Sequence, residues 1–458
     1  MTSTYLLERA WVDGAVREDV RVEVADGRFS RVAVGGGLDR LDHRGESDHR
    51  GEADRRGEAD RRLPGLTLPG FANAHSHVFH RALRGRTQHG SGDFWSWREQ
   101  MYAVAERLDP DALFLLARAT YAEMVAAGWT GVGEFHYLHH QPDGTPYADP
   151  AATAQALAAA ARETGIRLTL LDTCYLAAGI GRPPEGVQRR FSDGTAEAWG
   201  ARASKLHDAP PDGVLVGAAI HSVRAVPRDA LATVADWARH HEAPLHVHLS
   251  EQPAENAECR AAYGLSPTRL LHDAGALGPR TTVVHATHLA GEDLALLAGE
   301  ATGACLCPTT ERDLADGIGP ARRLHEAGAR VVLGSDSHAV VDPFEEMRAL
   351  ELDERLATGV RGHWSAAELL DTGAAHGHAA LGYADVGRIA VGQRADLVTV
   401  DTASARTAGT GADEHTAVFA ATAADVTHVM VDGRLLRPDR EAVGRGLDEA
   451  ITRIWRER

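Results

Sequence analysis

Positive charge is scarce in this 458-residue chain. Its 48 Lys and Arg residues oppose 65 Asp and Glu residues, which gives a formal net charge of −17 at pH 7. Nucleic acids and anionic membranes are bound through basic surfaces, so the charge argues against both as partners. A negative chain also disfavours long-range steering of an anionic substrate. An acidic substrate would therefore have to be held by arginines placed within the site.

Long apolar runs are missing as well. No stretch is long and apolar enough to cross a bilayer, and the N-terminus Met1–Arg9 lacks the basic region and apolar run of a secretion signal. The hydrophobic content of 44% and the charged content of 25% are ordinary for a globular protein. We therefore expect a cytoplasmic protein.

Cysteine is rare, with four residues in the whole chain. That number does not indicate a disulfide framework in a chain of this size. Cys305 and Cys307 form a C-x-C pair on an expected strand. A metal or redox pair would be one interpretation; two small buried residues is the interpretation that we favour, because free cysteine is commonly buried.

Both chain ends have the alternating pattern of short antiparallel strands. Over the first 35 residues apolar and polar positions alternate, and Asp13-Gly14 and Asp26-Gly27 are typical of hairpin turns. Residues 387–400 and 426–434 show the same pattern near the other end. We expect the two ends to build one small β-sandwich domain.

Between the two ends, apolar segments alternate with helical segments such as residues 150–164 and 228–241. This alternation predicts an α/β fold, a (β/α)8 TIM-type barrel over residues 66–382 with its site at the strand C-termini. Eight strand candidates end near His77, His136, Tyr175, His221, Glu251, His288, Thr310 and His338.

The small domain then comprises residues 1–65 and 383–458. Within it, residues 42–62 form a charged repeat with no apolar face. Such a segment cannot bury a core, and we expect a solvated, disordered loop.

Histidines at the expected strand ends predict a metal site. His75 and His77 form an H-x-H pair, and alternate residues on a strand point the same way. His246 and His248 share this spacing, and we choose His248 because it lies closer to the end of its strand. Asp336 follows a further apolar run. Three imidazoles and one carboxylate suit one divalent metal ion, with zinc expected, although iron and manganese use similar ligands.

Two more residues could take part in catalysis. Glu251 follows His248 by three residues, so it can reach a substrate without binding the metal and suits a proton shuttle; the alternative is a carboxylate favoured by a helix dipole. His285 ends another strand and could be a ligand or a neutral hydrogen-bonding electrophile. We favour the second, because a catalytic metal keeps a place for water. Asp336 would also accept the proton of that water.

Lysine is nearly absent, and this limits the kind of metal centre. Lys205 is the only lysine, and its surroundings indicate a helix end or a loop. Some barrel metallohydrolases bridge two metal ions with a carbamylated lysine on a strand. Because no lysine lies in an expected strand, the sequence favours a single metal ion.

These residues resemble the amidohydrolase superfamily, in the branch that deaminates with one zinc ion. The H-x-H pair is typical of the whole superfamily, whereas residues 94–98 and 134–140 are much more specific. The resemblance covers nearly the whole chain apart from residues 42–62. It is carried by residues 73–83, 93–99, 134–140, 220–224, 248–252, 308–311 and 334–338.

The resemblance implies a role for each candidate residue. Zinc would be bound by His75, His77, His248 and Asp336. Glu251 and His285 would have acid–base or orienting roles, and Tyr137, His221 and Arg224 would hold the substrate.

The resemblance further implies a reaction and an assembly. The expected reaction is hydrolytic deimination of a small acidic amidine, N-formimidoyl-L-glutamate, to N-formyl-L-glutamate and ammonia in histidine degradation. A homodimer is also expected.

This substrate carries two carboxylates. Arg224 is the first candidate to bind one of them, because a guanidinium matches a carboxylate in a two-point contact. Arg98 is a second candidate. His80 stands where the family usually has glutamine, and this side chain is expected to meet the substrate.

Two alternative functions remain open at this point. A deaminase of a purine or pyrimidine base would share the metal ligands but would not need an arginine for a carboxylate. A non-catalytic scaffold would need neither a complete ligand set nor Glu251.

Overall fold

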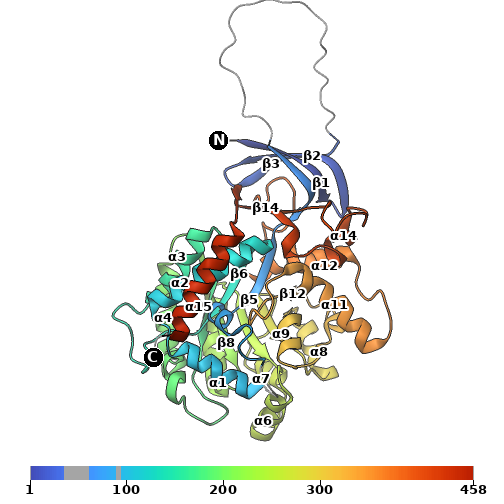
Figure 1. The fold of residues 1–458 in the computed structure, drawn as a ribbon. Helices are drawn as coiled ribbons and strands as arrows, with labels where there is room; N and C mark the ends of the chain where they lie inside the picture. Colours follow the sequence, from blue (N-terminus) through green and yellow to red (C-terminus); the bar gives the residue numbers. More distant parts are fainter. Residues whose placement is uncertain (1, 36–60, 89–93, 457–458) are drawn as a thin grey trace, which may run out of the picture.

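The computed structural model describes residues 2–35, 61–88 and 94–456. The charged repeat expected over residues 42–62 lies almost entirely outside them. In the described part, an eight-stranded parallel sheet forms a barrel, and a seven-stranded sheet built from both chain ends lies beside one end of it (Figure 1). The chain therefore has the TIM-type barrel and the additional β region that its sequence predicts.

Every neighbouring pair of strands in the barrel is parallel. A parallel bridge between Ser76 and Asp336 joins the first strand to the segment that follows the last strand, which brings the barrel close to closure. The strands, in their order around the barrel, are β5 (Phe71–Ser76), β6 (Trp129–His136), β7 (Arg167–Cys174), β8 (Val214–Ser222), β9 (Leu245–Leu249), β10 (Thr281–His285), β11 (Gly303–Leu306) and β12 (Val331–Leu333).

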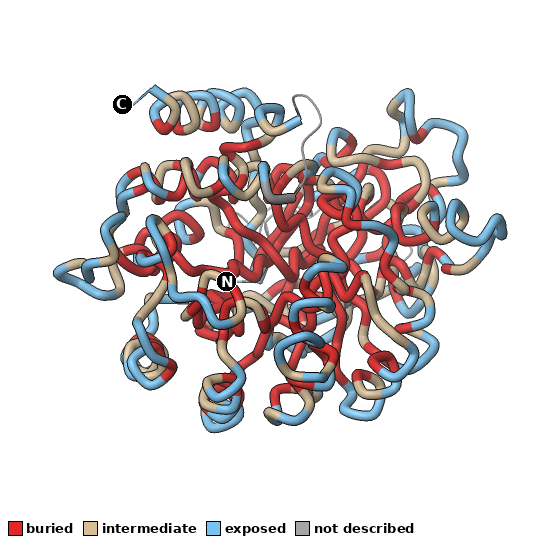
Figure 2. The backbone as a smooth tube through the Cα atoms, turned by 90° about the horizontal axis from the view of Figure 1, so that it is seen from below, coloured by how far each residue is buried: buried red, intermediate tan, exposed pale blue. Residues whose placement is uncertain are grey.

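Helices surround the barrel, and Figure 2 shows buried backbone at its centre and exposed backbone on the outer helices. The helices of the barrel region are η1 (Val78–Leu83), α1 (Phe94–Ala105), α2 (Pro110–Ala127), α3 (Ala152–Thr164), η2 (Gly186–Phe191), α4 (Ala196–Asp208), α5 (Arg228–His240), α6 (Pro253–Tyr263), α7 (Pro267–Asp273), α8 (Gly291–Gly299), α9 (Pro308–Asp313), α10 (Ala321–Glu326), α11 (Pro343–Thr358), α12 (Ala366–Asp371), η3 (Thr372–His376) and α13 (Gly377–Ala380).

Local signals explain where these helices begin and end. In α2, the side chain of Asp109 accepts a hydrogen bond from the Ala112 amide, and Pro110 occupies the first helical position, where its missing N–H costs nothing. Gly128 ends the helix in the left-handed region, with φ = 106°. The chain then enters β6 directly.

Several barrel strands end earlier than the sequence predicts. The predicted ends near Thr310, His288 and His338 are too late, since β11, β10 and β12 stop at Leu306, His285 and Leu333. At β11 the cause is Pro308, which opens α9 because it suits the first turn of a helix. As a result, many polar residues of the barrel mouth lie on the first residues after the strands rather than within them.

The second sheet is mixed. β1 pairs with β2 antiparallel and with β4 parallel, and β4 pairs with β13 antiparallel, so strands from both ends of the chain meet at its centre. In order across the sheet, its strands are β15 (Arg434–Leu436), β14 (Val426–Val431), β13 (Leu397–Val400), β4 (Arg61–Pro69), β1 (Ser3–Val12), β2 (Ala15–Ala25) and β3 (Arg28–Ala33).

The two expected hairpin turns are confirmed. Asp13 and Gly14 have φ values of 51° and 74°, and Val12 pairs with Ala15 on either side of them. Asp26 and Gly27 repeat this geometry between β2 and β3. Two consecutive positive φ values define the type I′ turn, whose twist matches that of the strands that it joins.

The C-terminal part of the chain returns to the barrel. The short helices α14 (Glu414–Phe419) and η4 (Ala423–Asp425) precede β14, and α15 (Arg440–Arg456) packs along α2 (Figure 1). A buried ion pair also joins the two sheets: Arg167, at the start of β7, donates to both carboxylate oxygens of Asp396 at 2.6 and 2.9 Å.

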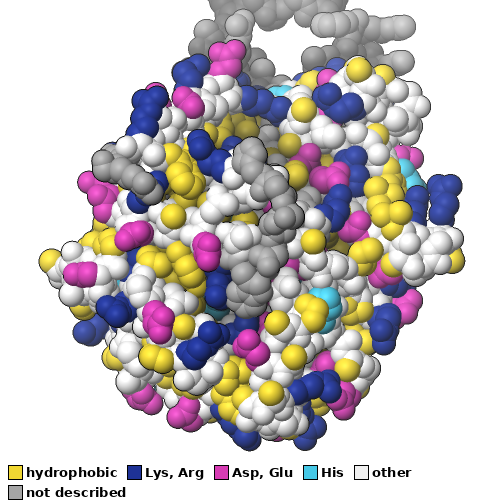
Figure 3. Space-filling model, turned by 60° about the horizontal axis from the view of Figure 1, so that its bottom comes forward, with side chains coloured by type: hydrophobic (Ala, Val, Ile, Leu, Met, Phe, Trp, Pro, Cys, Tyr) yellow, Lys and Arg dark blue, Asp and Glu magenta, His cyan; other side chains and the backbone are white. Residues whose placement is uncertain are grey.

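On the face drawn in Figure 3, acidic and basic side chains are interspersed among apolar ones, without a broad area of one sign. No helix in the described part of the chain combines the length and the hydropathy that a bilayer crossing requires.

Candidate metal centre and active site

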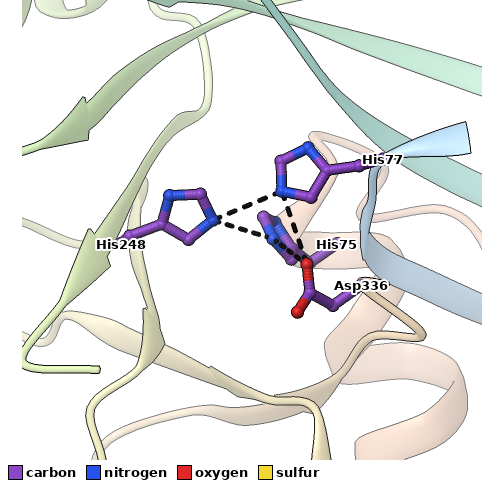
Figure 4. A group of neighbouring side chains, drawn as sticks. All are labelled: His75, His77, His248 and Asp336. Carbon is purple, nitrogen blue, oxygen red and sulfur yellow. Dashed lines mark hydrogen bonds and ion pairs between the residues drawn. The ribbon is translucent and has the colours of Figure 1, made fainter. Parts of the chain in front are cut away.

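Four buried side chains converge at the barrel mouth. His75 and His77 come from the end of β5, His248 from β9 and Asp336 from the segment after β12 (Figure 4). The Nε2 atom of His248 lies 3.1 Å from that of His75 and 3.4 Å from that of His77. The Oδ1 atom of Asp336 lies 3.3 Å from His75 Nε2 and 3.4 Å from His77 Nε2.

These spacings fit a bound cation. Donor atoms that surround a zinc ion tetrahedrally at about 2.1 Å lie about 3.4 Å from one another. Nδ1 of His77 faces the Phe135 carbonyl oxygen at 3.0 Å, and Nδ1 of His248 faces the His221 carbonyl oxygen at 2.8 Å. Because a carbonyl oxygen can only accept, both Nδ1 atoms carry the proton, and the Nε2 lone pairs point at the common centre. Lone pairs that face one another this closely suit a cation bound between them.

The imidazoles of this group are suited to metal binding before any metal arrives. Burial lowers the pKa of His75 and of His248 well below the usual value, and burial together with His75 lowers the pKa of His77 to about 3. The three rings are therefore neutral at physiological pH. Only a neutral imidazole offers a lone pair, so no proton has to be displaced when the metal binds.

His285 lies beside this group in a network of carboxylates. Its Nδ1 atom is 3.3 Å from Glu311, and its Nε2 atom is 3.7 Å from Glu251 and 3.9 Å from Asp336. Burial alone would lower the pKa of His285, but Glu251, Glu311 and Asp336 outweigh burial and raise the pKa well above its usual value. In this environment His285 can carry a proton toward the metal group.

Arg224 and Glu251 form an ion pair at the cavity wall. The Nη2 atom of Arg224 donates to Glu251 Oε2 at 2.9 Å, and Arg224 Nε lies 3.1 Å from Glu255 Oε2. Burial lowers the pKa of the Arg224 guanidinium, but Glu255 and then Glu251 outweigh burial and raise that pKa. The expected substrate-binding arginine and the expected proton shuttle are therefore in direct contact.

The structure brings the other predicted site residues to the same cavity. His80 and Tyr137 contact each other there, with Nε2 of His80 3.1 Å from the Tyr137 hydroxyl, and Arg98 lies over the ring of Tyr102, 5.6 Å from its centroid. The roles given to these residues stay predictions. The cavity is lined by His77, His80, Trp97, Arg98, Met101, Tyr102, Tyr137, Tyr175, Phe191, His221, Arg224, His248, Glu251, His285, Leu314 and Asp336.

Three other expectations concern residues outside the metal group. His246, the competitor of His248, lies deeper in the barrel with its Nε2 atom 3.1 Å from the Ala380 carbonyl oxygen. Lys205 is exposed on α4, away from the ligands. Cys305 and Cys307 are buried free thiols, in agreement with the structural interpretation of the C-x-C pair.

Sequence patterns do not single out three carboxylates that lie next to the site. Burial raises the pKa of Glu134 to about 8, and its carboxylate accepts hydrogen bonds from the Ser76 hydroxyl and the Val78 amide, on either side of His77. Glu255 contacts Arg224, and Glu311 contacts His285. A charged residue within an apolar strand was a usable signal for Glu134; the other two are recognisable only from their contacts.

Comparisons with known proteins agree on one family. A model described as the amidohydrolase family matches residues 66–436. The chain is 39% identical over 397 residues to formimidoylglutamate deiminase of Pseudomonas aeruginosa, covering 83% of this chain and 87% of that protein. It is 29% identical over 390 residues to a 5-methylthioadenosine/S-adenosylhomocysteine deaminase of Pelotomaculum thermopropionicum, covering 84% and 83%. Among solved structures, an amidohydrolase from Brucella melitensis has a TM-score of 0.87 and 31% identity, covering 99% of this chain and 100% of that one.

Proposed function

This chain belongs to the amidohydrolase family, and from that membership we propose that it hydrolyses N-formimidoyl-L-glutamate to N-formyl-L-glutamate and ammonia. It is a hydrolase that acts on C–N bonds. Two observations carry the choice of substrate. The partly buried Arg224 next to Glu251 in the cavity wall can bind a carboxylate of the substrate, and the chain is 39% identical to a formimidoylglutamate deiminase.

Zinc is the metal that we propose for this site. Three imidazole nitrogens and one carboxylate oxygen at these spacings are a donor set that zinc prefers. A zinc ion held there would supply a Lewis acid and would lower the pKa of a water ligand to about 7.

The chain's own residues carry out the proton transfers. Asp336 accepts a proton as the water oxygen bonds to the formimidoyl carbon, and His285 donates a hydrogen bond to that oxygen. Glu251 protonates the terminal nitrogen and later takes up the hydroxyl proton as the C=O bond forms, while Asp336 passes its proton to the same nitrogen, the C–N bond breaks, and ammonia leaves. Glu251 and Asp336 both lie near His285 Nε2, at 3.7 and 3.9 Å, so the two carboxylates can serve the same reacting centre.

Substrate recognition belongs to the side chains on the far side of the cavity. We assign one carboxylate to Arg224 and the second to Arg98, with Tyr137, His221 and His80 donating or accepting hydrogen bonds between them. Because the cavity is shielded from water, each such hydrogen bond contributes more to the binding free energy than it would in water. A polar group of the ligand or the cavity that finds no partner there costs binding free energy.

A purine deaminase is the second candidate, because a relative of this chain deaminates 5-methylthioadenosine and S-adenosylhomocysteine. The deciding assay measures ammonia release from N-formimidoyl-L-glutamate and from a panel of purines, pyrimidines and their nucleosides. We expect turnover of formimidoylglutamate with a kcat/KM at least about a thousandfold above any base, since a site built for a charged group rejects ligands that lack it. Preferential turnover of an adenosine derivative would overturn the assignment.

The proposed reaction also implies a pathway, a compartment and an assembly. A formimidoylglutamate deiminase belongs in histidine degradation, and we propose a cytoplasmic enzyme that acts on a small acidic amidine without nucleic acid or membrane partners. We also propose a homodimer. Light scattering on the purified chain tests the assembly, and a mass equal to the 48.9 kDa chain would contradict it.

A further inference from the structure

Glu255 lies behind the substrate-binding arginine. Its side chain has no exposed surface, and the residue is absent from the cavity lining, so it cannot touch a substrate in that cavity. Its Oε2 atom lies 3.1 Å from Nε of Arg224. Arg224 thus stands between two carboxylates, Glu251 within the cavity and Glu255 behind it.

Glu255 also holds the residue that precedes Glu251. Its Oε1 atom accepts a hydrogen bond from the Ser250 amide at 3.0 Å. Ser250 has φ = 50°, a left-handed backbone conformation that is costly for a residue other than glycine. The Ser250 hydroxyl donates to Asn256 at 2.8 Å, and the Ser250 carbonyl accepts from His288 at 3.0 Å. Such strain persists only where surrounding bonds overdetermine it, and two of these three bonds come from α6.

The position of Glu255 in its helix makes this arrangement unusual. Gln252 is the N-cap of α6 and Glu255 is the third helical residue. In a capping box, a glutamate at this position folds back onto the amide of a Ser or Thr N-cap, but here the N-cap is Gln252. Glu255 instead reaches the Ser250 amide, two residues before the N-cap, and Arg224. The side chain is therefore used outside its own helix end.

We propose that Glu255 is a positioning residue that fixes Arg224 and the Ser250–Glu251 turn relative to each other, and so determines the affinity for the substrate carboxylate. This inference rests on the proposed function. When Glu251 turns from Arg224 toward the reacting nitrogen, Glu255 remains as the buried partner that keeps the guanidinium aimed into the cavity.

The test compares Glu255→Gln with the wild type on three substrates. Glutamine keeps an oxygen for the Ser250 amide but removes the charge that faces Arg224. We expect KM for N-formimidoyl-L-glutamate to rise about 10- to 100-fold, because a hydrogen-bonded charge is lost, with zinc content unchanged and kcat reduced much less.

The other two substrates each lack one carboxylate: N-formimidoyl-4-aminobutyrate lacks the α-carboxylate, and N-formimidoyl-L-norvaline lacks the side-chain carboxylate. Where turnover is too slow, they serve as competitive inhibitors. For one of these two compounds, Glu255→Gln should no longer raise KM or the inhibition constant. Arg224→Met should likewise have no effect on the binding of that same compound. The proposal would be overturned if Glu255→Gln weakened the binding of all three compounds equally, or if it left KM for N-formimidoyl-L-glutamate unchanged.

Glu258→Gln is the matched control, because Glu258 is exposed on the same helix and should leave all constants unchanged. If Glu255→Gln does not fold, Glu255→Asp tests the same contact in another way: it keeps the charge but withdraws the carboxylate from Arg224, and KM for N-formimidoyl-L-glutamate should again rise. If the wild type does not release ammonia from formimidoylglutamate, the proposed function is overturned, but the positioning role of Glu255 is not. A crystal structure of the glutamine variant then decides separately: a displaced Arg224 guanidinium supports positioning by Glu255, and an unmoved one overturns it.

Discussion

At the scale of single residues, the site depends on which atoms are already committed to hydrogen bonds. The Phe135 and His221 carbonyl oxygens hold the Nδ1 protons of His77 and His248, which leaves both Nε2 lone pairs for the metal. The H-x-H spacing predicts that His75 and His77 face one point. It does not predict which ring nitrogen of His77 faces that point, because the carbonyl group that holds its Nδ1 proton belongs to another strand.

Replacing Asp336 by asparagine tests the carboxylate of the metal group. The variant keeps the size of the side chain but loses the acceptor for the proton of the attacking water, and we expect kcat to fall about 100- to 10,000-fold. Assays of ammonia release, run beside metal analysis, check this. A chelator should abolish wild-type activity and added zinc should restore it, whereas zinc should not rescue the variant. Near-normal kcat in the variant would remove Asp336 from the proton transfer.

Replacing Arg224 by methionine tests whether this arginine binds the substrate. We expect KM for N-formimidoyl-L-glutamate to rise about 30- to 5,000-fold, the range for truncating one partner of a buried ion pair, with one zinc per chain retained. Arg228→Met, at the exposed start of α5, is the control and should leave KM unchanged. Steady-state kinetics with metal analysis distinguish the two, and an unchanged KM in the Arg224 variant would exclude Arg224 from substrate binding.

At the scale of the elements, the ends of the barrel strands adopt costly backbone conformations. Non-glycine residues with positive φ at the mouth include Ser250, His285, Asp336 and His338, at 50°, 67°, 39° and 59°. Strain of this kind concentrates at functional sites, where the rest of the fold maintains it. It also explains why the predicted strand ends are too late: the apolar pattern continues to the polar residues, but the extended conformation stops before them.

Gly334→Ala tests how tightly the ligand strands pack. A Cβ atom at Gly334 would lie 2.7 Å from the Cβ atom and 2.8 Å from the carbonyl oxygen of His75, so β5 would have to move. We expect zinc occupancy and activity to fall at least about tenfold, because even a displacement of about 1 Å at a catalytic site is costly. Gly444→Ala in α15 is the control: apart from the adjoining residues and backbone of its own helix, no atom lies within 4 Å of the added methyl group, and the change should stabilise the helix by about 0.5–1 kcal/mol. Full zinc occupancy in the Gly334 variant would contradict this view of the packing.

At the scale of the whole molecule, the barrel and the second sheet are held together by buried charge. Arg167 begins β7 in the barrel, Asp396 precedes β13 in the second sheet, and Arg167 also donates to Asp432 at 2.7 Å. Breaking a buried ion pair by removing one partner typically costs about 3–5 kcal/mol. The second sheet therefore contributes to the stability of the barrel, not only to its surface.

Asp396→Asn tests this connection and its pH dependence. Burial alone would raise the pKa of Asp396, but the Arg167 guanidinium outweighs burial and lowers the pKa below its usual 3.8. The native state then binds fewer protons than the unfolded chain, so the stabilisation is complete above about pH 4 and is lost as the pH falls through the native pKa. We expect the variant to lose about 3–5 kcal/mol of unfolding free energy at pH 7, and the difference from the wild type to shrink below pH 4.

Urea unfolding at several pH values measures this difference. Asp236→Asn is the control, because Asp236 pairs with Arg239 on the surface with 65% of its side chain exposed, and its loss should cost less than about 1 kcal/mol. Equal losses in the two variants would show that the Arg167 pair does not join the two sheets energetically.

The sequence by itself determined the alternation of strands and helices, the hairpins at Asp13-Gly14 and Asp26-Gly27, and the residue types that gather at the candidate metal centre. These depend on local preferences and on periodicity, which neighbouring residues express without the rest of the fold. The position of His248 nearer the end of its strand already favoured it over His246, whereas only the tertiary structure placed Glu255 and Glu311 behind the site. The physical reason is that closing the barrel brings together strand ends separated by up to 261 positions, from His75 to Asp336, and no local pattern records which side chains then face each other.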